Sequence, residues 1–150
     1  MHHRRTRRIL IAAVLFRYER TCEILPSGDG SDTVKKIFQT TVAVLQESNL
    51  GILEVQSAFG MKVRTRQITS EDAAVLRQRL LGDVAGEIVR LIHLDSQHVS
   101  RAGMLVGKYG LTRRMRTPDA LQLAIAMDLQ KKSLLDVFVV ADRLLAEVAL

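Results

Sequence analysis

The fold is decided by the stretch Val137-Phe138-Val139-Val140-Ala141-Asp142, in which an unbroken apolar run ends on an isolated acid. Apolar residues without alternation are typical of a strand buried on both faces, as in a parallel sheet covered by helices. Ligands of open α/β sheets bind outside the carboxyl ends of such strands. Asp142 is therefore a candidate ligand residue at a sheet edge. The alternative is that it caps a helix over residues 143–148.

A second isolated acid, Asp119, opens an apolar helix in the stretch Arg116-Thr117-Pro118-Asp119-Ala120. We expect Thr117 to be the N-cap and Pro118 the first helical residue, where its missing N–H is not needed. The positive end of the helix dipole then favours the charged form of Asp119 and keeps it available to a cation. Taken alone, however, Asp119 is better explained as a residue that stabilises the helix start.

Glu54 is the third candidate. Apolar residues at positions 52, 55, 58 and 59 predict a helix capped by Ser48 or Asn49, with Glu54 facing small and apolar groups. Burying an unpaired carboxylate is costly or forces its protonation, so Glu54 needs a partner. A metal site or an arginine would serve equally.

Four blocks together resemble the PIN domain, a family that includes the VapC-type toxins of bacterial toxin–antitoxin pairs. The blocks are 48–59, Lys108-Tyr109-Gly110-Leu111, 116–124 and 138–142. They follow the family's order and spacing from about residue 30 to the end of the chain. No single block is diagnostic, but the set is fairly specific.

The resemblance implies that Glu54, Asp119 and Asp142 match three of the four acids with which the family holds Mg²⁺ or Mn²⁺ for RNA cleavage. In such a site the metal, bound largely through waters, generates hydroxide and neutralises charge on the phosphate. These three residues are the predicted catalytic and metal-binding residues.

The family's first acid has no counterpart here. It ends the first strand about fourteen residues before the Gly-Ser that this chain has at Gly30. Counting back reaches Phe16, and the nearest acids, Glu19, Glu23 and Asp29, lack the Thr or Ser context that accompanies it. The run from Ile9 to Phe16 predicts an inner strand without a carboxylate at its end. Weaker metal binding and reduced or absent cleavage are expected.

The alternation of strands and helices predicts one α/β domain with a parallel sheet covered on both faces. The resemblance implies the same three-layer α/β/α PIN-like fold, with a divergent first strand and without the family's last edge strand. We expect residues 1–29 to be a divergent N-terminal segment and 30–150 the PIN-like domain. The other expected elements are helices over about 31–39, 70–84 and 96–109 and strands near 42–45 and 88–93.

Charge suggests a nucleic-acid partner. The chain has 150 residues and a net charge of +6, from 22 basic and 16 acidic residues. Arg113, Arg114 and Arg116 precede Asp119, where they are expected to reach a phosphate backbone. The alternative is that they only solvate a loop. With no Trp, 2 Tyr and 4 Phe, base stacking is expected to be minor.

Several other classes of protein are disfavoured. A single cysteine, Cys22, excludes a disulfide framework, and His93 and His98, with the wrong spacing for zinc, are expected at the surface or in loops. The run after the N-terminal arginines is too short to span a bilayer and lacks a signal-peptide cleavage site, which predicts a cytoplasmic protein without a membrane partner.

Two functions remain open. One is a Mg²⁺- or Mn²⁺-dependent endoribonuclease of VapC type, acting on RNA, restrained by a cognate antitoxin that covers the acidic crevice, and able to form a homodimer. The other is a degenerate PIN domain that keeps a partner- or RNA-binding surface but does not cleave. Three retained acids favour the first function, and the missing acid and final strand favour the second.

Overall fold

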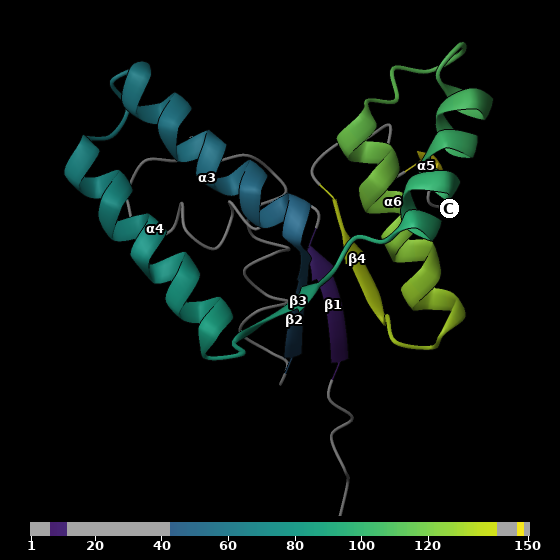
Figure 1. Ribbon diagram of the computed structural model, residues 1–150, viewed down its shortest axis with the longest axis horizontal. Helices are drawn as coiled ribbons and strands as arrows, with labels where there is room; N and C mark the ends of the chain where they lie inside the picture. The colour runs from purple at the N-terminus through teal and green to yellow at the C-terminus, as the bar shows by residue number, and fades with distance from the viewer. Residues whose placement is uncertain (1–6, 12–42, 141–146, 149–150) are drawn as a thin grey trace, which may run out of the picture.

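The computed structural model describes residues 7–11, 43–140 and 147–148 (Figure 1). Asp142, the expected helix over 31–39 and the expected boundary between residues 29 and 30 lie outside these ranges. Among the described residues, no helix is long and apolar enough to cross a membrane.

A parallel sheet of four strands forms the centre of the described structure, in the order β3-β2-β1-β4. The strands are β1 (Arg7–Ile11), β2 (Ala43–Ser48), β3 (Val89–Ile92) and β4 (Val137–Val139). All three pairings are parallel. The predicted parallel sheet is confirmed, and β1, from the N-terminal segment, lies inside it between β2 and β4.

Helices cover both faces of the sheet (Figure 1). The helices α3 (Asn49–Arg64) and α4 (Ser70–Ala85) share one apolar cluster with Val137 and Val139 of β4. On the other face, α5 (Ser96–Tyr109) and α6 (Thr117–Lys131) share clusters with Phe138. Alternate residues of one strand thus enter opposite cores. The predicted three-layer α/β/α fold is confirmed.

The described helices begin where the sequence predicted, with one exception. Thr69 caps α4 in a reciprocal capping box with Asp72, and α5 spans the predicted residues. The predicted cap of α6 is wrong: Arg116 occupies the N-cap position and Thr117 is already helical. The reason is Asp119, whose Oδ2 accepts a hydrogen bond from the Arg116 backbone N–H at 3.2 Å and so starts the helix one residue earlier.

His98 is a second correction. It is only 5% exposed at the start of α5, not a surface or loop residue. Its Nδ1 accepts from the Asp95 backbone N–H at 3.2 Å, and its Nε2 lies 3.4 Å from Asp128 Oδ2 on α6. The imidazole therefore joins the two helices of this face, and His93, beyond β3, is exposed as expected.

Candidate active site

The junction of β2 and α3 places the first polar groups of the site. The strand ends at Ser48 and the helix begins at Asn49, with no loop between them. Ser48 Oγ accepts from the Gly51 backbone N–H at 2.8 Å, so of the two predicted caps Ser48 is the one in use. A strand that passes directly into a helix holds side chains at its end rigidly.

Glu47, the residue before this cap, is fully buried at 0% exposure. Its Oε1 accepts from the Ser48 backbone N–H at 2.8 Å and from Gln122 Nε2 of α6 at 3.3 Å. Burial raises the pKa of the Glu47 carboxyl to about 8, because the loss of water outweighs the hydrogen bonds that lower it. The sequence interpretation did not single out this acid.

Gln122 connects the elements of the site. Besides its bond to Glu47, its Nε2 donates to Ser48 Oγ at 3.2 Å, and its amide is hydrogen-bonded to Glu54. Two buried oxygen atoms in this group, Glu47 Oε2 and Gln122 Oε1, have no hydrogen-bond partner. Such atoms are uncommon in folded proteins, since buried acceptors are nearly always satisfied.

Glu54 is half-buried on α3. Burial raises its pKa, the negative charge of Asp119 adds to this rise, and the hydrogen bond with Gln122 opposes it. In the described part of the chain the amide of Gln122 is a partner of Glu54, and the role of Glu54 as a metal ligand stays a prediction.

Asp119 is half-buried at the start of α6, where it stabilises the helix start as the simpler alternative proposed. The negative charge of Asp119 raises the pKa of Glu54, and that of Glu54 raises the pKa of Glu47. Asp142 lies outside the described residues. Within residues 7–11, 43–140 and 147–148, no three His, Cys, Asp or Glu side chains form a group placed to hold a metal ion.

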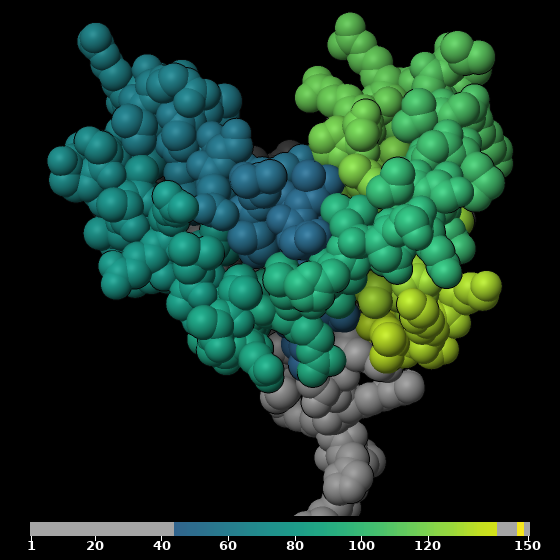
Figure 2. Space-filling model, in the orientation of Figure 1, coloured from purple at the N-terminus to yellow at the C-terminus, as the bar shows by residue number. Residues whose placement is uncertain are grey.

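The surface is hollowed between the starts of α3 and α6 (Figure 2). The loop before α6 carries Arg113, Arg114 and Arg116, all of them exposed. Arg113 Nη1 lies 3.2 Å from Glu147 Oε2 in an exposed ion pair. Arg114 and Arg116 precede Asp119 in the chain by five and three residues.

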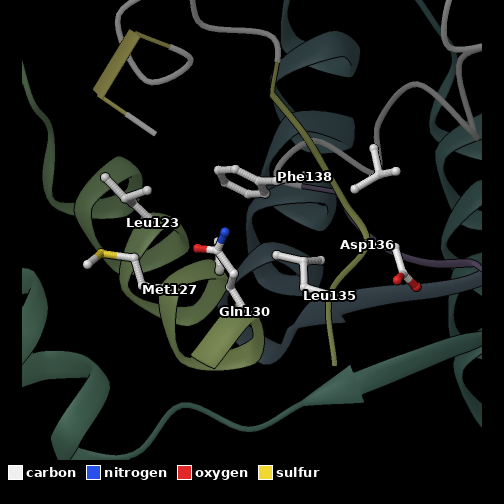
Figure 3. A pocket seen from close by; sticks show the side chains of 8 residues that line it. Leu123, Met127, Gln130, Leu135, Asp136 and Phe138 are labelled. Atoms are coloured by element: carbon white, nitrogen blue, oxygen red, sulfur yellow. The ribbon is translucent and has the colours of Figure 1, made fainter. Parts of the chain in front are cut away.

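A separate cavity of about 140 Å³ lies between α6 and β4 (Figure 3). Its lining is largely apolar, with Gln130 and Asp136 as polar members. It contains none of Glu47, Glu54 and Asp119. The acids therefore face a different region from this cavity.

Comparison with solved structures shows the fold. The crystal structure of Mycobacterium tuberculosis VapC20, a sarcin–ricin loop cleaving toxin, matches with a TM-score of 0.64 over 93% of this chain and 94% of that chain, at 15% identity. No family model and no curated protein matches the sequence. The chain has a VapC-like PIN fold, and at this identity the likeness extends to the fold alone.

The first prediction concerns pH. The Glu47 carboxyl has a pKa of about 8 in the folded chain, against 4.5 for an ordinary glutamate. Between these values the unfolded chain has lost a proton that the folded chain keeps, so the free energy of unfolding falls as pH rises, by up to about 1.4 kcal/mol per pH unit. Urea unfolding of metal-free protein from pH 4.5 to 8 should show this loss in the wild type relative to Glu47→Gln.

The variant should fold because its added amide N–H can donate to the unpartnered Gln122 Oε1. Parallel pH curves for the two proteins would show that Glu47 is not a buried acid of raised pKa.

The second prediction concerns Gly51. A Cβ at this position would overlap the Glu47 carboxyl group, whereas a Cβ at Gly82 in α4 would meet nothing within 4 Å. Gly51→Ala should destabilise the fold by about 1–3 kcal/mol through overpacking, and Gly82→Ala should stabilise it by up to about 1 kcal/mol through helix propensity. Chemical denaturation of both variants measures the difference, and equal effects would contradict the packing of Glu47 against Gly51.

Proposed function

We propose that this chain is a Mg²⁺- or Mn²⁺-dependent endoribonuclease of the VapC toxin type, with Glu54, Asp119 and Asp142 as its catalytic and metal-binding residues. The observation that carries the proposal is the electrostatic effect of Asp119 on Glu54, on a fold that matches a VapC toxin. Carboxylates brought together without a cation repel each other, so the arrangement favours a cationic occupant.

The residues of the site fit a hard divalent cation. The candidate ligands are oxygen atoms, and two buried oxygens beside Glu54 lack a donor. Mg²⁺ and Mn²⁺ prefer carboxylate, carbonyl and water ligands. Glu54, Asp119 and Asp142 would hold the ion, which when bound activates water and offsets charge on the phosphate. Gln122 orients Glu54 through their hydrogen bond.

RNA is the proposed substrate. Arg113, Arg114 and Arg116 precede Asp119, and the chain carries a net charge of +6. Exposed arginines beside a crevice attract phosphates without reading the bases. Because Arg113 pairs with Glu147, Arg114 and Arg116 should contribute more of the RNA affinity.

A protein partner is part of the proposal. Large apolar side chains are exposed on α3 and α5, including Leu53 at 63%, Val99 at 58% and Met104 at 67%. Exposed apolar groups of this size favour contact with another protein chain. We assign them to a cognate antitoxin, which would restrain the toxin by covering the acidic crevice, and to a homodimer. A cytoplasmic location follows from RNA as substrate.

The second candidate function is a PIN domain that binds RNA or a partner without cleaving. The missing acid after the first strand favours it, as does the finding that no three acidic, His or Cys side chains among the described residues are grouped for a metal. In this case the arginines still bind RNA, and the acids only stabilise the fold.

The third prediction tests cleavage. Wild-type protein with Mg²⁺ or Mn²⁺ should cut single-stranded RNA, and chelator should abolish the cut. Asp119→Asn and Glu54→Gln should each lower the rate at least about 100-fold, because each removes a charge from the site. Both variants should fold, since an amide oxygen can still accept the helix-start bond from Arg116 or lie beside Gln122.

The matched control is Glu71→Gln, an exposed acid in the first turn of α4. It should cleave like the wild type. Folded wild-type protein that binds RNA but never cleaves it, with either metal, would establish the second function and exclude the first.

The fourth prediction tests the arginines. Arg114→Ala should weaken RNA binding equally for different sequences, and the slope of log affinity against log salt should fall by about 0.7, as for one lost contact with single-stranded phosphate. Arg79→Ala, an exposed arginine on α4, is the control. Fluorescence anisotropy at several salt concentrations measures both, and an unchanged slope in Arg114→Ala would remove this residue from the interface.

A further inference from the structure

Glu47 lies where the missing acid can be replaced. Strands β1 and β2 are parallel neighbours, with Leu10 paired to Gln46, so Glu47 comes one residue later, at the same edge where β1 ends. Adjacent strands are about 4.8 Å apart. Glu47 therefore places a carboxyl-bearing residue within about one strand spacing of the last residue of β1.

The surroundings of Glu47 leave part of its carboxyl unused. Its side chain is fully buried, yet only Oε1 has hydrogen bonds, while Oε2 has none. Gln122, 2% exposed, has an unpartnered Oε1 beside it. Two buried acceptor oxygens without a donor are what a bound cation and its waters would satisfy.

Charge adds a second argument. Glu47 and Glu54 lie close enough to interact electrostatically, and so do Glu54 and Asp119 of α6. In the described part of the chain, no Lys or Arg forms an ion pair with any of these three acids. Carboxyl groups gathered beside buried oxygens, without a basic partner among the described residues, favour a divalent ion over a monovalent side chain.

We infer that Glu47 is a metal-binding residue that supplies, from the end of β2, the carboxylate that the first strand lacks. The inference rests on the proposed function for the identity of the ion. Gly51 makes room for this carboxyl, because a Cβ there would overlap it. Hard cations reach many of their protein ligands through water, so acids that do not meet at one point in the metal-free chain can share an ion.

The fifth prediction concerns Mn²⁺ binding in the absence of RNA. Mn²⁺ is titrated into the protein, and the free ion is measured by its electron paramagnetic resonance signal. Glu47→Gln should lower the affinity at least about tenfold, as Glu54→Gln does, and Glu71→Gln should leave it unchanged. A folded Glu47→Gln protein that binds Mn²⁺ like the wild type, while Glu54→Gln does not, would overturn the inference and leave Glu47 as a structural acid.

A measurement on the unmutated chain covers the case in which Glu47→Gln fails to fold. Fe²⁺ bound in the site, with ascorbate and peroxide, produces radicals that cut the backbone nearby, and mass spectrometry locates the cuts. Cleavage at the Glu47–Ser48 end of β2 as well as near Glu54 supports the inference; cleavage near Glu54 and Asp119 alone overturns it. Because neither experiment measures RNA hydrolysis, a metal-binding chain that does not cleave would refute the proposed activity and not the role of Glu47.

Discussion

The fold and the candidate site both depend on the hydrogen bonds that join Glu47, Ser48 and Gln122. These bonds connect the end of β2, the first turn of α3 and the middle of α6, which lie on different layers of the structure. Because β2 passes into α3 without a loop, Ser48 is both the last residue of the strand and the N-cap of the helix. The position of Glu54, on the second turn of α3, then follows from where that helix begins.

A buried polar group of this kind has a cost that an apolar core would avoid. Glu47 is fully buried and holds its proton more tightly than an ordinary carboxyl group, and two oxygens remain without partners. Chains tolerate unsatisfied polar groups mainly where function requires them. The apolar clusters on the two faces of the sheet offset the free energy that this burial costs. The position of the network at the carboxyl edge of β2 is where an α/β sheet places its ligands.

The sequence predicted the elements well where local signals are strong. Thr69 with Asp72 fixed the start of α4, and the span of α5 was predicted to the residue, because capping acts over three or four positions. The start of α6 was misplaced because Asp119 accepts a hydrogen bond from the Arg116 backbone N–H, so that the helix already includes Thr117. Glu47 was missed since Gln46-Glu47-Ser48 has the composition of an exposed strand end, and only the long-range contact with Gln122 reveals its burial.

The match to a VapC toxin at 15% identity shows what the fold requires and what it does not. The architecture requires only apolar residues with the right periodicity, caps at helix starts and a parallel sheet. Many sequences meet these requirements. The chemistry requires particular carboxylates at one edge of the sheet, but it does not specify which strand must carry each one. A first strand without its acid therefore does not by itself decide against a metal site. The decision depends on the number of carboxyl groups and of unpartnered oxygens that the neighbouring elements bring to that edge, and the end of β2 contributes to both.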